Sequence, residues 1–361
     1  MRVAMYYGAR DIRIEDAPDP SPKADELLLR VAVTGVCGTD AKEWASEPYM
    51  FPIAIPDPVT GHSGPMIPGH EIVGRVVAVG EAVNGFSEGA LVVSGAGISC
   101  GRCPWCRRGR TNLCERYATV GLQRHGGLAE FVAVPAGTCV DVAPYGLAPD
   151  VAALAQPMSI GVHAMRRGRL RPGEAAVVIG IGGVGTFLTH AAVSRGATIV
   201  AVDVDAHRLG QATRLGATHV LDPTSGIDVE RYLAERDLVP AVIYEVSGTT
   251  VGLASALGAA TRGTRLVAIG LQGQHLSLDT LDLTLREIEL IGSNAHVFAR
   301  DLSEALRLLA AREAGWSDVA PMAVPLDSLV DEALVPMATG TARQIKTLID
   351  PWATAPRATV S

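Results

Sequence analysis

The pattern of hydrophobic and polar positions changes near residue 150 and divides the chain into two regions. Before this point, short apolar stretches are broken by Gly and Pro, which is typical of β-strands joined by tight turns. The clearest strands are predicted at Leu27–Val33, Glu71–Gly80 and Gly127–Pro135. Residues 1–150 are therefore expected to form a β-rich region.

After residue 150, strand-like runs alternate with helical stretches. Strands are predicted at residues 175–180, 198–203, 219–222, 241–248, 264–270 and 287–293. Helices are predicted up to Arg195, at Ala206–Leu215, at Thr249–Ala259 and, beyond a boundary near residue 295, at Asp301–Gly315. The alternation predicts βαβ units and an α/β fold with a parallel sheet.

One uncharged stretch, Ala175–Ser194, is 20 residues long, which is enough to cross a membrane. Its glycines and charged flanks instead favour a buried strand, a glycine turn and a helix. The first residues contain no apolar run of signal-peptide length. The cytoplasm is therefore the expected location.

Composition narrows the classes of partner. The 361 residues carry a formal net charge of −7, and only 4% of them are aromatic. A mildly acidic chain without a polybasic run is not expected to bind nucleic acid or a membrane surface. Because 48% of the residues are hydrophobic and 19% are charged, a folded chain is expected.

A glycine-rich turn follows the predicted strand that ends near Ile179. Its sequence fits the GxGxxG fingerprint of dinucleotide-binding proteins, and the turn residues are Gly180, Gly182, Gly183, Val184 and Gly185. The glycines permit a tight turn, close approach of a pyrophosphate and close packing of helix on strand. The alternative is the same turn in a domain that binds no ligand.

Asp203 ends the second predicted strand, 18 residues after Gly185. A carboxylate there can accept hydrogen bonds from both hydroxyls of an adenosine ribose and repels a 2′-phosphate. Val204 and Asp205 offer no compensating cation, so NAD is predicted over NADP. Asp205 is the rival acid, but a cap on the following helix is its expected role.

Four cysteines follow the pattern C-x2-C-x2-C-x7-C, at Cys100, Cys103, Cys106 and Cys114. Four thiolates this close together suit tetrahedral zinc and leave no position for a substrate. A structural zinc is therefore predicted, with disulfides or unliganded thiols as the alternatives. Cys139 is expected to be a small buried residue.

A second set of metal-ligating residue types comprises Cys37 in CGTD and His70-Glu71 in PGHE. A thiolate, an imidazole and a carboxylate can form an open zinc site with a position for water or an alcohol. Cys37 and His70 alone would be weak evidence, since a lone His is usually structural.

Together these motifs resemble the zinc-dependent medium-chain alcohol and polyol dehydrogenases, in particular the 2,3-butanediol and sorbitol dehydrogenase branch, over essentially the whole chain. The resemblance is carried by CGTD, GHE, the four-cysteine lobe, GGLAEF (126–131), QPMSIGVHAMRRG (156–168), GIGGVG and DVDAHRL (203–209). It implies a GroES-like catalytic domain over residues 1–150 and 295–361, and a Rossmann NAD-binding domain over residues 151–294.

The resemblance implies that Cys37 and His70 bind the catalytic zinc with Glu71 as third ligand. Relatives carry Glu where this chain has Gln156, so participation of Gln156 through water and a role as a spacer remain open. Thr39 is expected to start a proton relay, or alternatively to bond a local turn. Asp40 is expected either to accept from His70 or to cap a helix.

Further residues are placed near the cofactor or substrate by resemblance. The expected cofactor contacts are Arg208, Ile269, Gly270, Leu271, Asn294 and Ala295. The alternative for Arg208 is a solvated charge on a helix, and the alternative for the other residues is ordinary packing at the ends of strands. Large side chains after CGTD either line the substrate pocket or bury the long connection; these are Trp44, Tyr49, Met50 and Phe51. His163 is expected in the core.

The predicted activity is hydride transfer between a secondary alcohol, of the polyol or vicinal diol/acetoin type, and NAD. It would use two zinc ions per chain, one catalytic and one structural. A sugar or cyclitol dehydrogenase is the nearest alternative, and a non-catalytic NAD-binding protein with a decayed zinc site is an alternative of another class. A metal-free quinone-reductase-like relative is disfavoured by Cys37, His70 and Glu71. A homo-oligomer, tetramer or dimer, is expected by resemblance.

Overall fold

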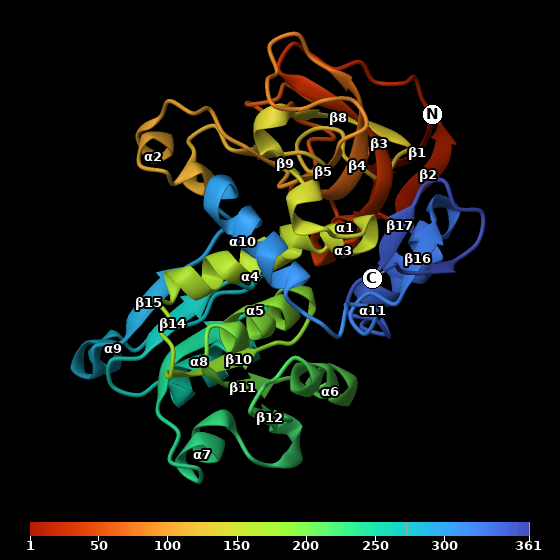
Figure 1. Ribbon diagram of the computed structural model, residues 1–361. Coiled ribbons are helices and arrows are strands. Elements are labelled where there is room, and N and C mark those ends of the chain that lie inside the picture. The colour runs from red at the N-terminus through yellow and green to blue at the C-terminus, as the bar shows by residue number, and fades with distance from the viewer. Residues whose placement is uncertain (272, 361) are drawn as a thin grey trace. The chain divides into compact units, whose positions relative to one another are not determined.

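The computed structural model describes residues 1–271 and 273–360, which fold as two compact units. The first unit combines Met1–Gln156 with His296–Ser361, and the second is Pro157–Ala295. Each unit has its own sheet, and Figure 1 shows that red and blue segments, from opposite ends of the chain, share the first one. The domains predicted from sequence had their limits at residues 150 and 294.

Within the described residues, the first unit contains an eight-stranded sheet with the order β18-β16-β17-β3-β4-β5-β9, and β8 pairs with β3. Its strands are β3 (Glu26–Gly35), β4 (Glu71–Val79), β5 (Leu91–Ser94), β8 (Phe131–Pro135), β9 (Cys139–Asp141), β16 (Met322–Pro325), β17 (Leu348–Asp350) and β18 (Arg357–Ala358). Two small sheets are formed by β1 (Arg2–Gly8) with β2 (Asp11–Asp16) and by β6 (Gly97–Ile98) with β7 (Ala118–Thr119).

Short helices surround these sheets. The α-helices are α1 (Gly38–Ala45), α2 (Pro104–Arg107), α3 (Pro149–Ala152), α10 (Phe298–Ala310) and α11 (Val335–Thr339), and α4 (Ala155–Arg167) begins at the last two residues of the unit. Single-turn 3₁₀ helices lie at Thr111–Leu113, Ala136–Thr138, Ala143–Tyr145 and Leu326–Ser328, and a π-helical segment lies at Leu329–Leu334.

The second unit is a parallel sheet, as the alternating pattern predicts. In the described chain its order is β12-β11-β10-β13-β14-β15. The strands are β10 (Ala175–Ile179), β11 (Thr198–Val202), β12 (His219–Leu221), β13 (Pro240–Glu245), β14 (Arg265–Ala268) and β15 (Glu289–Gly292). The connecting helices are α5 (Gly183–Ser194), α6 (Ala206–Arg214), α7 (Val229–Ala234), α8 (Thr250–Ala259) and α9 (Thr280–Arg286), with a 3₁₀ turn at Pro223–Ser225.

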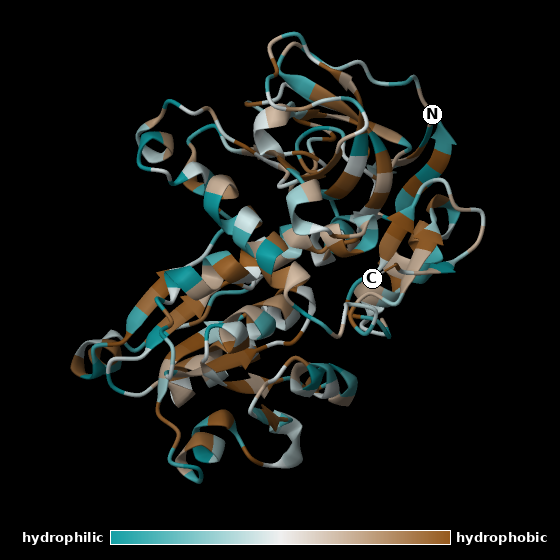
Figure 2. Ribbon diagram, in the orientation of Figure 1, coloured by the Kyte–Doolittle hydropathy of each residue, from teal (hydrophilic) through white to brown (hydrophobic). Residues whose placement is uncertain are grey.

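The central strands of this sheet are apolar along their length. Helices cover both faces of a parallel sheet, so residues on either face are buried. Val177, Val200 and Ile243 are fully buried in one core cluster, and the strands that hold them are coloured mainly as hydrophobic in Figure 2. The uncharged stretch at residues 175–194 forms β10, a glycine turn and α5, as predicted.

Two predicted elements begin three or more residues away from their predicted start. The strand predicted from Gly127 begins at Phe131, because the amides of Gly127 and Leu128 donate to the carbonyls of Gly69 and Pro68 instead of to a neighbouring strand. The last helix begins three residues earlier than predicted. Asp301 accepts a hydrogen bond from the Val297 amide at 2.8 Å, which satisfies the helix start.

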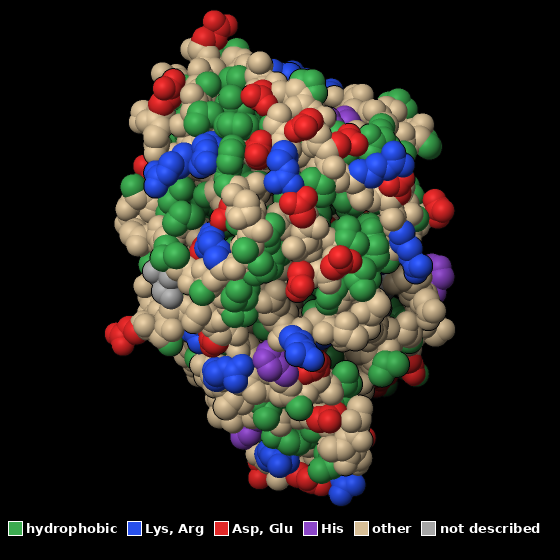
Figure 3. All heavy atoms as spheres, turned by 90° about the vertical axis from the view of Figure 1, so that its right-hand side faces the viewer, with side chains coloured by type: hydrophobic (Ala, Val, Ile, Leu, Met, Phe, Trp, Pro, Cys, Tyr) green, Lys and Arg blue, Asp and Glu red, His purple; other side chains and the backbone are tan. Residues whose placement is uncertain are grey.

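The charge of the surface and the character of the helices can be compared with the prediction that the chain binds neither nucleic acid nor a membrane. On the face shown in Figure 3, Lys and Arg are interspersed with Asp and Glu, so that face has no broad field of one sign. No helix in residues 1–271 or 273–360 combines the length and apolar character that a membrane span requires.

Candidate functional site

The structure brings Cys37, His70 and Glu71 together at one end of the first unit's sheet. Cys37 precedes α1, His70 precedes β4, and Glu71 is the first residue of β4. Antiparallel pairing places Glu71 opposite Gly35, close to Cys37 in sequence. One ligand atom from each of the three side chains lies within 4.8 Å of the others.

Asp40 links the helix start to the histidine. Its Oδ2 accepts a hydrogen bond from the Cys37 amide at 2.9 Å, and its Oδ1 lies 3.6 Å from Nδ1 of His70. Burial opposes a charge on His70, but Asp40 and Cys37 favour it and hold its pKa well above the usual value. Asp40 therefore caps the start of α1 and also faces the imidazole.

Lys346 lies against this cluster and was not among the residues predicted from sequence. Its Nζ donates to Oε1 of Glu71 at 2.7 Å and to the carbonyl of Val36 at 3.0 Å, and both charged side chains are buried. Burial opposes the charge of Lys346, but Glu71 and Cys37 keep its pKa above the usual value. The signal in the sequence was one lysine in the apolar run before residue 350.

The donor atoms of this cluster fit a metal ion. Buried polar atoms are normally hydrogen-bonded. Within the described part of the chain, Oε2 of Glu71 is buried and has no hydrogen-bond partner, and Nδ1 of His70 faces Oδ1 of Asp40 beyond hydrogen-bond distance. A thiolate, an imidazole and a carboxylate form a ligand set that zinc accepts in open sites.

Thr39 and Gln156 lie in the same unit. Thr39 is in the first turn of α1, and its Oγ1 is 3.8 Å from Sγ of Cys37. Gln156 is buried at the start of α4. A proton relay through Thr39 and a contact of Gln156 with zinc stay predictions.

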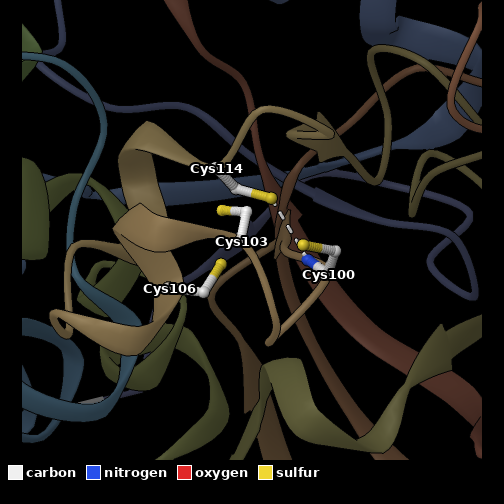
Figure 4. Close-up of side chains that lie close together, drawn as sticks. All are labelled: Cys100, Cys103, Cys106 and Cys114. Carbon is white, nitrogen blue, oxygen red and sulfur yellow. Dashed lines mark hydrogen bonds between the residues drawn. The ribbon is translucent and has the colours of Figure 1, made fainter.

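The four cysteines of the lobe converge as their spacing predicts. Cys103 caps α2, Cys106 lies within it, Cys100 precedes it, and Cys114 follows the 3₁₀ turn at residues 111–113. Their sulfur atoms lie within 4.8 Å of one another, and Figure 4 shows the four side chains directed toward a common centre.

Backbone amides stabilise thiolates in this lobe. Sγ of Cys114 accepts from the amide of Cys100 at 3.2 Å, the dashed line in Figure 4, and from that of Arg116 at 3.3 Å. Hydrogen bonds from the backbone of Cys106 and Glu115 lower the pKa of Cys103 to about 6, whereas burial raises the pKa of Cys106 to about 12. All six cysteines of the chain are free thiols, so four clustered thiolates fit a tetrahedral metal.

The glycine turn of the second unit has the geometry that a dinucleotide requires. Gly180 has a φ of +96°, and a Cβ there would lie 2.7 Å from the Ser247 amide. A Cβ at Gly185 would lie 1.9 Å from the Gly180 carbonyl oxygen. Among the described residues, a Cβ at Gly182, which precedes α5, would meet no atom within 4 Å. The helix start is thus open to an anion such as a pyrophosphate.

Asp203 is tied to this turn. Its Oδ2 accepts from the Ile181 amide at 2.7 Å, and its Oδ1 accepts from the Asp205 amide at 3.0 Å. Nη1 of Arg208 lies 3.8 Å from Oδ2 of Asp203. Asp205 caps α6 through the amides of His207 and Arg208, as predicted.

The other predicted cofactor contacts lie near the carboxyl ends of β14 and β15. The amides of Ile269 and Gly270 donate to the carbonyl of Glu245, and Leu271 is exposed. Asn294 and Ala295 follow β15, and Ala295 adopts a φ of +48°. Whether these residues contact a cofactor stays a prediction.

Of the large side chains that follow CGTD, Trp44 and Phe51 pack in the core of the first unit. Trp44 packs in a core cluster of the first unit, and Phe51 stacks edge-on against Tyr6 at 4.9 Å. Tyr49 is 85% exposed. Two residues with other expected roles, His163 in α4 and Cys139 in β9, are buried as predicted.

The chain is similar to known dehydrogenases in both of its regions. Residues 23–144 match the alcohol dehydrogenase GroES-like domain, and residues 183–311 match the zinc-binding dehydrogenase domain. Sorbitol dehydrogenase of Bacillus subtilis (strain 168) is 33% identical over 304 residues, which cover 81% of each chain. L-galactonate-5-dehydrogenase of Escherichia coli (strain K12) is 29% identical over 312 residues, 86% of this chain and 87% of that protein.

Solved structures give the same result. The 2R,3R-butanediol dehydrogenase from Bacillus subtilis superposes with a TM-score of 0.88 at 27% identity, over 97% of this chain and 99% of that one. A zinc-binding dehydrogenase from Sinorhizobium meliloti 1021 bound to NADP has a TM-score of 0.84 at 28% identity, with the same coverage.

The fold and the two sites define an oxidoreductase with a GroES-like domain and a Rossmann-type domain, as the sequence predicts. The chain belongs to the zinc-dependent alcohol dehydrogenase family. Zinc and a nicotinamide cofactor are the groups that its sites suit.

Proposed function

We propose that the chain oxidises a secondary alcohol, a polyol or a vicinal diol, with NAD and reduces the corresponding ketone in reverse. The observation that carries this proposal is the convergence of Cys37, His70 and Glu71, which each bring one ligand atom within 4.8 Å of the others. Similar proteins named for sorbitol, L-galactonate and butanediol support this substrate class. One zinc ion would lie here and a second in the four-cysteine lobe.

Cys37, His70 and Glu71 would hold a zinc ion, which would supply Lewis-acid chemistry to the substrate hydroxyl. Asp40 faces Nδ1 of His70 and so keeps the imidazole proton on that nitrogen, leaving the other for the metal. Lys346 fixes one oxygen of Glu71 and leaves Oε2 for the ion. Thr39 accepts the hydroxyl proton on Oγ1 and passes its own toward solvent.

Substitution of a ligand tests the assignment. Two zinc ions per chain are expected in fully loaded wild-type protein by mass spectrometry of the metal. Cys37→Ala should retain one ion and lose more than about 100-fold in turnover. Loss of a residue that only orients a metal ligand already costs up to about 100-fold in activity, and loss of the ligand itself should cost at least as much. Cys139→Ala, a cysteine outside both clusters, should retain both ions and full turnover. Undiminished turnover of Cys37→Ala would reject the roles assigned to the three ligands.

The zinc count also separates the alternative class. Gln156 carries no charge where relatives have Glu, which favours a decayed site, and one ion per wild-type chain would support that alternative. If two ions are found, a panel of diols, polyols, sugars and cyclitols with NAD separates the proposed substrate class from a sugar or cyclitol dehydrogenase.

We further infer that the cofactor is NAD. Asp203 is an acid at the end of β11, where a 2′-phosphate would be repelled, although Arg208 lies nearby. Asp203→Ala should reduce the preference for NAD over NADP, measured as the ratio of the two kcat/KM values. Asp205→Ala is the matched control, because it removes an acid that caps α6 and should leave that ratio unchanged. An unchanged ratio in Asp203→Ala would contradict the assignment.

We also infer that the chain forms a homo-oligomer, a tetramer or dimer. In it, the parallel sheets of the second units of two chains would pair along their edges. In the described chain β15 has a neighbour on one side only, and the exposed side chains of Leu281, Leu285 and Leu290 lie on it or just before it. Exposed apolar edges are sites of chain pairing. Leu290→Lys should lower the mass measured by light scattering to that of a smaller assembly, and a monomeric wild type would overturn the inference.

A further inference from the structure

Glu245 is a fully buried carboxylate that the mechanism above does not use. It ends β13, and its Oε1 accepts from the hydroxyl of Ser247 at 2.5 Å and from the amide of Gly248 at 3.1 Å. Its own carbonyl accepts from the amides of Ile269 and Gly270. One residue thereby holds the loops that follow β13 and β14.

Glu245 lies beside the dinucleotide turn. In the register of β10 and β13, it is paired with Ile179, the residue before Gly180. The strand order reverses between these two strands, and dinucleotides bind at the carboxyl ends of strands at such a point. Asp203, on the β11 side, marks the adenosine half. The nicotinamide half is therefore expected on the opposite side, over β13 and β14.

Charge distinguishes the two redox forms of the cofactor at this position. The oxidised nicotinamide ring carries a positive charge, which hydride transfer removes. Oε1 of Glu245 accepts from a hydroxyl and from an amide, and such hydrogen bonds favour the charged form of a carboxylate. In a buried setting such a charge acts strongly on a neighbouring ring, because little solvent screens it.

We propose that Glu245 sets the relative affinity for the two cofactor forms, favouring the oxidised over the reduced nicotinamide through its negative charge. It acts as a positioning and charge-setting residue without taking part in proton or hydride transfer. This role rests on the proposed binding of NAD by the second unit.

The test compares two binding constants in the zinc-loaded full chain. Dissociation constants for NAD⁺ and NADH are measured separately by calorimetry and by NADH fluorescence. Glu245→Gln keeps the size of the side chain and an oxygen that accepts from Ser247 and Gly248, but it removes the charge. The ratio of the NAD⁺ constant to the NADH constant should rise about fivefold or more, a size that a single buried charge supplies.

A second variant tests the charge without altering the core. Ser247 is exposed, so Ser247→Lys places a cation beside the carboxylate and should raise the same ratio. Ser247→Gln adds similar bulk without charge and should change both constants together. An unchanged ratio in Ser247→Lys, or in a folded Glu245→Gln, overturns the proposal. Failure of the wild-type chain to bind either dinucleotide would overturn the proposed function instead.

Discussion

Two buried carboxylates of the first unit lie against opposite charges. Glu26 meets Arg124 at 2.8 Å, and Glu71 meets Lys346 at 2.7 Å. Such pairs add little to stability relative to apolar residues, but removal of one partner is costly because the other charge stays buried. The pair of Glu71 and Lys346 also has a role at the candidate metal site, because Lys346 holds the Glu71 carboxylate in place.

The pair of Glu26 and Arg124 predicts a pH-dependent stability. Burial opposes the charge of Glu26, but Arg124 and the Lys23 amide outweigh it and lower its pKa in the folded chain. The stabilisation is therefore present above the unfolded pKa of about 4.3 and is lost as the pH falls through the lower folded value. Glu26→Gln should cost about 2 kcal/mol of unfolding free energy at pH 7.

Urea unfolding at a series of pH values measures this effect. The difference between wild type and Glu26→Gln should shrink steadily below about pH 4. Glu88→Gln, at an exposed position, should match the wild type throughout. A difference of the same size at pH 3 and pH 7 would show that the charge of Glu26 is not its cause.

At the scale of elements, local patterns were predictable. The apolar runs of β10, β11 and β13, the glycine turn and the Asp205 cap each depend on residues close in sequence. The hairpin of β1 and β2 was missed because its turn lacks a typical Asn-Gly or Asp-Gly pair, and Arg10 adopts the left-handed conformation instead.

At the candidate metal site, too, features that depend on neighbouring residues were predictable and features that depend on distant residues were not. The metal ligands were found from short motifs, since CGTD and GHE are each continuous in sequence. Lys346 could not be assigned to Glu71, because 275 residues separate them and only the pairing of β17 with β3 brings them together. Sequence patterns indicate which residues ligate, and long-range strand pairing determines what holds them.

The four-cysteine lobe is predicted to depend on its metal for order. Its helix α2 has four residues, and β6 and β7 have two residues each, so the backbone makes few regular hydrogen bonds. Small elements of this kind fold only when a metal links them. Cys103→Ala should lose one of two zinc ions and raise amide exchange over residues 100–116, measured by hydrogen-exchange mass spectrometry.

Exchange in the second unit should stay unchanged in that variant. Cys139→Ala removes a cysteine from a core cluster and should retain both ions and the protection of the lobe. Full protection of residues 100–116 in metal-depleted Cys103→Ala would show that packing alone orders the lobe.

At the scale of the whole molecule, the two units differ in how the chain builds them. The second unit is continuous in sequence, whereas the first needs both ends of the chain. Leu348 and Ile349 of β17 pair with Gly35 and Thr34 of β3, and β16 and β18 extend the sheet from there. Residues 1–156 alone would therefore leave the Thr34–Gly35 end of β3 without β17, although β8 would still pair with the beginning of β3.

This difference predicts opposite behaviour of two fragments. Residues 157–295 contain a complete parallel sheet with its own core, so they should fold alone, give a dispersed amide NMR spectrum and unfold cooperatively in urea. Residues 1–156 should give a poorly dispersed spectrum, because they lack β17 and the C-terminal residues that complete a core cluster, and the apolar surface left uncovered favours association over folding. Joining residues 1–156 to 296–361 by a long Gly/Ser linker should restore dispersion. A well-folded fragment 1–156 would show that the C-terminal strands complete the sheet without being needed for its formation.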